Sequence, residues 1–359
     1  MRLLNLTEYE AAARAVLPQM AFDYIAGGAD DEVTLRENRE AFGRLRLRPS
    51  VLAGVGERDA RVSVLGQEIS FPVMVAPVAF HRLAAPEGEL ATARAAGAVG
   101  TAMCVSTASN YTLEEVADVA SGPLFFQLYC YKDRGLTQSL VDRAREAGYR
   151  AVMLTADTPL SGRRERDIRN RFTLPPGLGW KNTEGWGKRD LPQHAEGSGL
   201  ADYIAGELEA NLTWADLDWL ASVSGLPVVV KGVLCGEDAG LAAEHGAAGV
   251  VVSNHGGRQL DTALASIDAL PEVVAAAEGT GLEVLLDGGV RRGTDVLKAL
   301  ALGARAVLVG RPVIWGLAVG GESGARAVLE LLRDEFDIAL ALVGCPRAAD
   351  LHPGLVVRP

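Results

Sequence analysis

Eight short apolar runs recur along this chain, and their number and spacing constrain its fold more than any other feature. They occupy residues 73–79, 101–106, 125–129, 151–157, 228–233, 249–254, 284–289 and 306–311. Most are continuous rather than alternating, as in VMVAPVA and AVLVGR, which is typical of parallel strands with both faces buried. Ala- and charge-rich stretches with helical spacing separate most of them. The pattern predicts an α/β fold, a (β/α)8 TIM barrel, rather than an open doubly wound sheet, which usually has fewer strands.

Local helix signals agree with this prediction. Gly148 and Gly246 each follow a helical stretch, and glycine is common just past the last turn of a helix. Thr112 and Glu115 form a capping-box pattern at another helix start. Thr7 and Glu10 form a second such pattern ahead of an Ala-rich run, so we expect residues 1–70 to be an N-terminal helical segment before the barrel.

Residues 178–213 interrupt the strand–helix alternation. They are Gly-rich and polar, and they are too long for an ordinary connection between a strand and a helix. We expect a long lid loop after the fourth strand; a surface insertion without a role is the alternative. The length of 359 residues, 48% of them hydrophobic, would fit one large barrel or two smaller domains. Eight similar units favour a single domain over residues 1–359.

Composition limits the function classes. The formal net charge of −11 disfavours binding to nucleic acid or to anionic lipid. The four cysteines lie far apart without a CxxC pair, and the five histidines form no HxH or HxxxH pattern, so we expect no metal site and no disulfide framework. No stretch approaches the roughly 18 apolar residues of a membrane span, and no signal peptide is evident at the N-terminus. We therefore expect a cytoplasmic protein.

Polar side chains gather where the predicted strands end, which is where barrel enzymes carry their active sites. Any one of these residues could be a surface ion pair. Their convergence on one rim instead predicts a site. They are Gln127, Tyr129, Thr155, Asp157, Arg163, Arg164, Lys231, Ser253, His255, Arg258, Asp287, Arg291, Arg292 and Arg311.

The segments after the last two strands, DGGVRRGTD and GRP, indicate a phosphate site. Barrels often bind phosphate with these two loops, because glycines let backbone N–H groups approach the oxygens and arginines donate to them. A phosphorylated cofactor or substrate is therefore expected. Lys231, near the end of a mid-barrel strand, also allows a Schiff-base lyase at this stage.

SNHGGRQLD (253–261) resembles the signature of the FMN-dependent 2-hydroxy acid oxidising family, which includes glycolate oxidase, lactate oxidase and mandelate dehydrogenase. The resemblance covers essentially the whole chain. It includes FDYIAGGADDEVTLREN, FPVMVAPVAF, FFQLYCYKDR, DTPLSGRRERDIRNRF, VVVKGV, DGGVRRGTDVLKALALGA and GRPVIWGLA, in the order and spacing of the family. It implies a barrel that binds FMN at the strand ends and oxidises an L-2-hydroxy acid to the 2-oxo acid, with O2 reduced to H2O2.

The resemblance assigns cofactor-binding residues. The backbone N–H of Ala79 would lie near flavin N5, with Pro77 and Val78 beside it. Lys231 would lie at the N1–C2=O edge, where its charge favours the anionic reduced flavin. The remaining contacts to the ring, the ribityl chain and the phosphate are implied for Ser106, Gln127, Thr155, Ser253, Asp287, Gly288, Gly289, Arg291, Gly310 and Arg311.

The resemblance also assigns the chemistry on the substrate. Arg258 and Arg164 would bind its carboxylate, and His255 would be the base, with Asp157 orienting the imidazole. Tyr24 and Tyr129 would hydrogen-bond the carboxylate and the developing oxo group. Both a hydride transfer and a carbanion route stay open.

Three departures from the family pattern bear on specificity. The usual Pro-Thr-Ala-Met of the first strand is Pro77-Val78-Ala79-Phe80 here, which removes a hydroxyl near the flavin. Ala108 and Ser161 stand where short-chain glycolate oxidases carry tryptophan and a bulky apolar residue. We therefore expect a wider pocket and larger L-2-hydroxy acids.

Three other activities are alternatives to the oxidase. They are a dehydrogenase that reduces a quinone or another acceptor, oxidative decarboxylation of the lactate-monooxygenase kind, and the flavin-free lyase that would use Lys231. The family also implies a homo-oligomer, a tetramer or an octamer of barrels.

Overall fold

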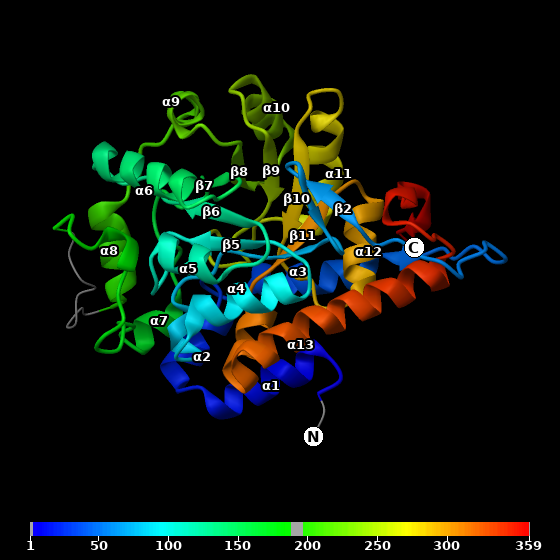
Figure 1. Cartoon of the computed structure of the whole chain (residues 1–359), viewed down its shortest axis with the longest axis horizontal. Coiled ribbons are helices and arrows are strands. Elements are labelled where there is room, and N and C mark those ends of the chain that lie inside the picture. The colour runs from blue at the N-terminus through cyan, green and yellow to red at the C-terminus, as the bar shows by residue number, and fades with distance from the viewer. Residues whose placement is uncertain (1–2, 188–196, 359) are drawn as a thin grey trace.

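The computed structural model describes residues 3–187 and 197–358. At its centre, eight parallel strands close into a barrel in the order β10-β11-β4-β5-β6-β7-β8-β9 (Figure 1). Each predicted apolar run contains most of one strand, so the (β/α)8 prediction is confirmed. The barrel strands are β4 (Val73–Val75), β5 (Met103–Ser106), β6 (Leu124–Leu128), β7 (Val152–Thr155), β8 (Val228–Val233), β9 (Gly249–Val252), β10 (Glu283–Asp287) and β11 (Ala306–Val309).

Helices surround this barrel, and most of them cover the outer faces of its strands, whereas α7 and α8 lie to one side of it (Figure 1). They are α4 (Gly88–Ala98), α5 (Leu113–Val119), α6 (Arg134–Glu146), α7 (Glu165–Arg169), α8 (Gly199–Glu207), α9 (Trp214–Ser224), α10 (Gly236–Glu244), α11 (Ser266–Ala277), α12 (Gly293–Ala301) and α13 (Arg311–Val343). Single-turn helices occur at η1 (His81–Leu83), η2 (Lys181–Thr183), η3 (Ala348–Asp350) and η4 (Pro353–Leu355). The capping box of Thr112 and Glu115 is present at the start of α5, as predicted.

The N-terminal segment is helical only in its first part. Its helices are α1 (Leu6–Val16), α2 (Gln19–Ala26) and α3 (Val33–Arg44), and α1 packs along α13 (Figure 1). The predicted cap at Thr7 is wrong, because Asn5 is the N-cap residue and its side chain accepts from the backbone N–H of Glu8.

The later part of the predicted N-terminal helical segment contains short strands instead of helix. β2 (Val62–Val64) and β3 (Gln67–Ile69) form a hairpin, because Leu65 and Gly66 both adopt positive φ, at 48° and 74°, as a tight hairpin turn requires. β1 (Arg46–Leu47) pairs with β12 (Val356–Val357) near the other end of the chain.

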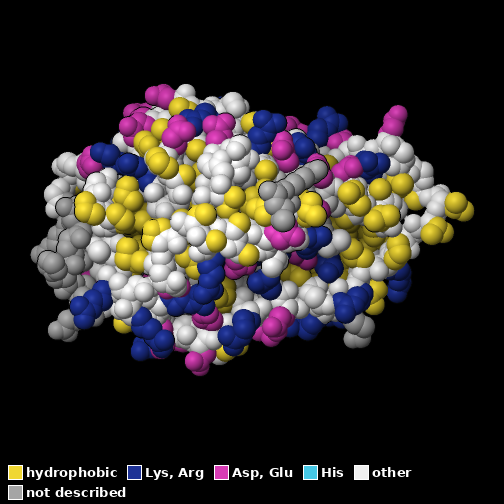
Figure 2. Space-filling view, turned by 90° about the horizontal axis from the view of Figure 1, so that it is seen from below, with side chains coloured by type: hydrophobic (Ala, Val, Ile, Leu, Met, Phe, Trp, Pro, Cys, Tyr) yellow, Lys and Arg dark blue, Asp and Glu magenta, His cyan; other side chains and the backbone are white. Residues whose placement is uncertain are grey.

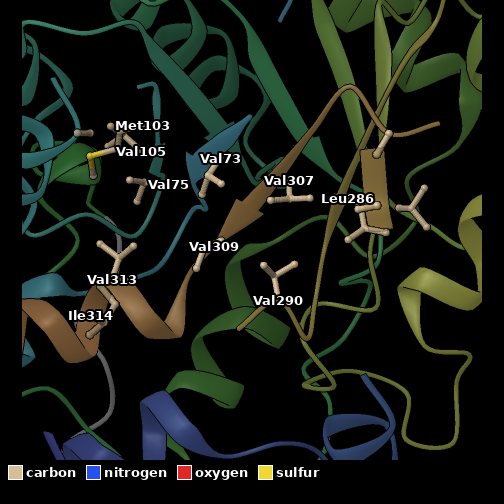
Figure 3. Close-up of a cluster of buried hydrophobic side chains, with 14 of the residues drawn as sticks. Val73, Val75, Met103, Val105, Leu286, Val290, Val307, Val309, Val313 and Ile314 are labelled. Carbon is tan, nitrogen blue, oxygen red and sulfur yellow. The ribbon is translucent and has the colours of Figure 1, made fainter. Parts of the chain in front are cut away.

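Two apolar layers hold the barrel together. Alternate residues of each strand point inward and outward. Inward residues such as Met74, Cys104 and Leu308 form one buried cluster, and outward residues join the larger cluster under the helices. Figure 3 shows part of the outer layer, where valines of β4 and β11 lie beside Val313 and Ile314 of α13.

The inward layer also explains which side chains reach the site. Two residues beyond an inward apolar residue, the chain again points inward, but now at the C-terminal rim of the barrel. This step leads from Cys104 to Ser106, from Met153 to Thr155 and, in the same way, to Gln127, Lys231, Ser253, Asp287 and Gly310. The strands therefore deliver the polar set to one face as a consequence of the pleat.

Helix α4 carries a buried carboxyl group against the loops that follow β4 and β5. Oε1 of Glu89 accepts from the backbone N–H groups of His81 and Asn110, at 3.1 Å each. Its Oε2 is buried and has no hydrogen-bond partner among the described residues. Burial raises the pKa of Glu89 to about 7.

We expect Glu89→Gln to alter how stability depends on pH. Because the folded pKa lies above the ordinary value of 4.5, the wild-type protein loses stability as pH rises from about 4.5 to about 7. Glutamine does not ionise, so the variant should gain on the order of 3 kcal/mol relative to the wild type between pH 4.5 and pH 8. Denaturant unfolding at the two pH values measures this. Glu244→Gln, on the exposed end of α10, is the control, and an equal pH trend in Glu89→Gln and the wild type would contradict the assignment.

Acidic and basic side chains are interspersed over the face shown in Figure 2 rather than separated into a basic patch. Within residues 3–187 and 197–358, the structure contains no helix with the length and apolar content needed to cross a membrane.

Candidate active site

A cavity opens at the C-terminal ends of the barrel strands. Most residues predicted from the strand ends and from the family resemblance line it. These are Tyr24, Pro77, Val78, Ala79, Ser106, Ala108, Gln127, Tyr129, Thr155, Arg164, Lys231, His255, Arg258, Asp287, Gly288, Gly289, Arg291, Gly310 and Arg311. Asp157 and Ser253 lie behind this lining and hydrogen-bond residues in it. Ser161 is not part of the lining that the described residues form, and its hydroxyl donates to the carbonyl of Gly162, so the geometry does not support its predicted role in widening the pocket.

His255 lies on an unusual turn directly after β9. His255, Gly256 and Gly257 all have positive φ, at 58°, 66° and 74°. This region is unfavourable for a residue with a side chain, and such strain is frequent at functional sites. The hydroxyl of Ser253 accepts from the backbone N–H of His255 at 3.0 Å and so supports the turn. The two glycines let the chain reverse, so that His255 and Arg258 both face the cavity.

His255 pairs with Asp157, which follows β7. The distance from His255 Nδ1 to Asp157 Oδ1 is 2.9 Å. Burial lowers the pKa of His255, although Asp157 opposes this shift in part. Burial also raises the pKa of Asp157, but His255 and Lys231 outweigh this effect and hold its pKa to about 2. A neutral imidazole beside a permanent carboxylate is a suitable general base.

Gln259 connects the two loops that carry this pair, and the sequence analysis gave it no role. Its Nε2 donates to the carbonyls of Asp157 and Leu160 at 2.8 and 2.9 Å, and its Oε1 accepts from the N–H of Gly162 at 3.0 Å. Gly232 also makes room for Asp157, since a Cβ at Gly232 would lie 2.5 Å from the Cβ of Asp157.

Lys231 lies in a compact polar network at the centre of the rim. Its Nζ donates to Ser253 Oγ at 2.9 Å and lies 3.2 Å from Asp287 Oδ2. Ser253 Oγ donates in turn to Asp287 Oδ1 at 2.6 Å. Burial alone would lower the pKa of Lys231, but Asp287 and Asp157 outweigh it and the pKa is raised. The lysine therefore stays protonated at neutral pH.

Two cavity arginines are bound to the C-terminal end of α2. Arg258 Nη1 donates to the carbonyls of Tyr24 and Gly27, at 2.6 and 3.0 Å. Arg311 donates to the carbonyls of Ile25 and Gly27, at 2.9 and 2.8 Å. Helix C-termini are partially negative, so α2 is well suited to orient both cations. A predicted helix from the N-terminal segment thus helps to build the site.

Arg164 and Arg258 are neighbours, as expected of a pair that binds one anion. Arg164 Nε donates to the carbonyl of Arg258 at 3.4 Å. Burial, and then the charge of Arg258, lowers the pKa of Arg164 to about 10, so it remains a cation. Arg163, by contrast, is exposed and pairs with Glu165 outside the cavity.

The tyrosines and the amide network complete the polar part of the lining. Tyr24 stacks on Phe172 with ring centroids 4.2 Å apart. Burial raises the pKa of Tyr129 to about 12, so its hydroxyl remains a donor. At the ends of β5, β6 and β7, Ser106 donates to Gln127 Oε1 at 3.0 Å, and Gln127 Nε2 donates to Thr155 Oγ1 at 2.9 Å.

The segment 178–213, predicted as a lid, contributes three residues to the lining: Trp180, Leu200 and Ile204. It therefore covers part of the cavity, although residues 188–196 of the predicted lid lie outside the described residues. Sequence reasoning missed these three side chains. An aromatic residue within a Gly-rich segment was the only available indication.

The sequence matches the family described as FMN-dependent dehydrogenase over residues 13–358. The chain belongs to this family. The resemblance given by SNHGGRQLD is thereby confirmed, and FMN is the cofactor.

Relatives of known activity cover nearly the full length. The chain is 56% identical to an L-lactate oxidase of Nostoc sp. over 353 residues, which is 97% of this chain and 96% of the relative. It is 55% identical to glycolate oxidase 5 of Oryza sativa subsp. japonica over 357 residues, with 99% and 96% covered. Among solved structures, mandelate oxidase with (S)-4-hydroxymandelic acid aligns with a TM-score of 0.93 and 45% identity, covering 97% of each chain.

The cavity fits a phosphorylated flavin. Arg291 Nε is buried and has no partner among the described residues, which leaves a donor for an anion. Gly288 and Gly289 have φ of 94° and 86°, and a Cβ at Gly289 would lie 1.9 Å from the carbonyl oxygen of Asn38. The loop after β10 therefore has room only for glycine at position 289, and its backbone lies at the cavity. Within the described ranges, no group of three or more His, Cys, Asp or Glu residues could hold a metal ion.

Proposed function

We propose that this FMN enzyme oxidises an L-2-hydroxy acid to the 2-oxo acid and passes the electrons to O2, forming H2O2. One observation carries the proposal: a histidine–carboxylate pair and two adjacent arginines face the same cavity. Oxidation of a 2-hydroxy acid requires both, because arginines can bind the carboxylate of the acid and the histidine can remove a proton from its hydroxyl group or its α-carbon. FMN, when it is bound, accepts the two electrons that the substrate loses.

Each polar side chain then has a role. Arg258 and Arg164 bind the substrate carboxylate, and the hydroxyl groups of Tyr24 and Tyr129 donate to the substrate oxygens. His255 accepts the departing proton at Nε2, because its Nδ1 faces Asp157. Asp157 stabilises the imidazolium that results.

The same reasoning assigns the cofactor contacts to the strand ends. The hydroxyl groups of Ser106 and Thr155 and the amide of Gln127 are suited to the polar edge of the flavin ring, and the backbone at Pro77, Val78 and Ala79, which follows the neighbouring strand β4, is assigned to the ring as well. Lys231 and Ser253 support the pyrimidine side. The phosphate and ribityl contacts are assigned to Asp287, Gly288, Gly289, Arg291, Gly310 and Arg311.

Names among the relatives favour O2 as the acceptor, since L-lactate oxidase, glycolate oxidase and mandelate oxidase are all oxidases. A dehydrogenase that uses a quinone or another acceptor is the second candidate, because (S)-mandelate dehydrogenase also aligns, with a TM-score of 0.92 and 41% identity. The lyase alternative needs a neutral lysine, and the raised pKa of Lys231 argues against it.

Product analysis in air tests the acceptor. With L-lactate or (S)-mandelate as substrate, we expect one H2O2 and one 2-oxo acid for each O2 consumed. A carboxylic acid shortened by one carbon, with CO2, would instead indicate oxidative decarboxylation. Turnover with a quinone or a dye but not with O2 would indicate a dehydrogenase.

We expect the acid limb of the kcat/KM profile to lie below pH 6.5. His255 must be neutral to accept a proton, and burial lowers its pKa from the ordinary 6.5. Activity should therefore persist to a lower pH than a free imidazole would allow. Asp157→Asn removes the opposing charge and should move the limb to still lower pH while reducing the rate. A limb centred above pH 6.5 would contradict the assignment of His255 as the base.

We also propose that residues 1–359 form one domain and that the protein is a cytoplasmic homotetramer. Its four cysteines are free thiols, in agreement with a reducing compartment. Exposed apolar side chains at Val51, Leu52, Ile338 and Leu342 are suited to contacts between subunits. Sedimentation velocity of the purified protein measures the subunit number.

A further inference from the structure

Trp180 lies in the wall of the cavity, yet neither the strand-end pattern nor the proposed chemistry gives it a role. It belongs to the segment after β7 and immediately precedes η2. Its side chain is 7% exposed, and it lines the cavity together with Ala108, Leu200 and Ile204. Ala108, Leu200 and Ile204 are aliphatic, and the indole of Trp180 is uncharged, with an Nε1 that has no partner among the described residues. This side of the cavity therefore differs from the charged side formed by the arginines and His255.

Backbone hydrogen bonds hold Trp180 beside the loop that carries Ala108. The N–H of Lys181 donates to the carbonyl of Ser109 at 3.1 Å, and Asn110 Nδ2 donates to the carbonyl of Gly179 at 3.1 Å. Both neighbours of Trp180 are thus bound to residues next to Ala108. The indole position is fixed by the fold as described and needs no closure of a lid.

Aromatic contacts fix the orientation of the indole. Its ring meets Phe80 edge-on, with centroids 5.7 Å apart at 70°, and lies against Tyr203 with centroids 4.5 Å apart at 30°. The N–H of Phe80 donates to the carbonyl of Ala108 at 3.1 Å, which ties this aromatic group to the same loop. The indole therefore packs against Phe80 and Tyr203 and also borders the cavity.

Ala108 and Trp180 together set the size of this side of the cavity. Ala108 leaves volume next to the polar site, and Trp180 beside it limits how far that volume extends. We propose that Trp180 is a specificity-determining residue that contacts the side chain of the 2-hydroxy acid and limits its length. The inference rests on the proposed function, and it names the substrate class: acids with an uncharged, apolar side chain of limited length.

The test compares chain-length profiles of Trp180→Leu, the wild type and the control Trp186→Leu. Trp186 lies in the same segment, is 40% exposed and is not part of the cavity lining that the described residues form. The substrates are L-lactate, 2-hydroxybutanoate, 2-hydroxyhexanoate and 2-hydroxyoctanoate, each measured as kcat/KM with the FMN-loaded enzyme. In Trp180→Leu the ratio of kcat/KM for 2-hydroxyoctanoate to kcat/KM for 2-hydroxybutanoate should rise by about tenfold or more. In Trp186→Leu it should stay at the wild-type value.

Ala108→Trp provides the reciprocal variant. It should lower the same ratio, because a second indole would occupy the volume next to the polar site. An unchanged profile in Trp180→Leu, or an equal change in Trp186→Leu, would overturn the inference.

A binding measurement separates this inference from the proposed function. The Kd values of the matching 2-oxo acids are measured from the change in flavin absorbance, which requires no turnover. The preference of Trp180→Leu for the longer 2-oxo acid should rise in parallel with kcat/KM, and equal Kd ratios in the variant and the wild type would overturn the role of Trp180. If no 2-hydroxy acid reduces the wild-type flavin, the proposed function fails, while the Kd ratios still decide on Trp180.

Discussion

His255→Ala is expected to bind FMN as the wild type does and to reduce it with a 2-hydroxy acid about 10²–10⁴-fold more slowly, the usual effect of losing a positioned base. Alanine removes the only imidazole in the cavity lining that the described residues form. Among the described residues, Asp157 Oδ1 then keeps only the hydroxyl of Thr158 as a hydrogen-bond partner, and Asp157 is not part of the cavity lining. The measurement is the rate of flavin bleaching in a stopped-flow mixing experiment without oxygen.

His245→Ala is the matched control. His245 also pairs with an aspartate, since its Nδ1 lies 2.9 Å from Asp218 Oδ1, but this pair lies on the surface between α9 and α10. Its loss should leave the rate unchanged. Flavin reduction by His255→Ala at the wild-type rate would show that His255 is not the base.

Lys231→Met should produce the second large effect. Methionine is similar in length but has no charge, so the site would lose the cation that the network of Ser253 and Asp287 holds in place. A fixed charge at the point where negative charge develops typically contributes about 10²–10³-fold to the rate. We expect slower flavin reduction by about this factor and a more negative midpoint potential of the bound flavin.

Lys298→Met controls for the loss of a buried lysine. Lys298 lies on α12, and its Nζ donates to the carbonyl of Phe42 at 2.8 Å, outside the cavity lining. This variant should lose stability but keep the flavin potential. An unchanged potential and an unchanged reduction rate in Lys231→Met would remove Lys231 from the proposed chemistry.

The barrel and most of the residues at its rim could be predicted, because both are determined by the sequence of each strand and the residues next to it. Strand runs such as Val152–Thr155 and Val228–Val230 are mostly apolar, and the pleat of each strand fixes which residue reaches the rim, as in the step from Val229 to Lys231. The capping box at Thr112 is equally local. Site residues that lie at the C-terminal end of a barrel strand could therefore be identified from the sequence.

Other parts of the site depend on contacts between distant segments. The carbonyls at the end of α2 bind Arg258, some 230 residues away, and no local pattern indicates this. Trp180 enters the cavity because its neighbours bind the loop after β5. Gln259 connects two loops through backbone groups, which leave no trace in the sequence. The hairpin of β2 and β3 was missed because its Leu65-Gly66 turn lacks the asparagine or aspartate common in such turns.

Anaerobic reduction of the bound FMN tests the central claim most directly. The yellow holoprotein is mixed without oxygen with glycolate, L-lactate, (S)-mandelate or L-2-hydroxyoctanoate, and the (R) enantiomers of the three chiral acids are the controls. We predict that the flavin absorbance is lost with at least one (S) acid, that one 2-oxo acid forms per flavin, and that the colour returns when air is admitted. A flavin that dithionite reduces but that none of these acids bleaches would contradict the account.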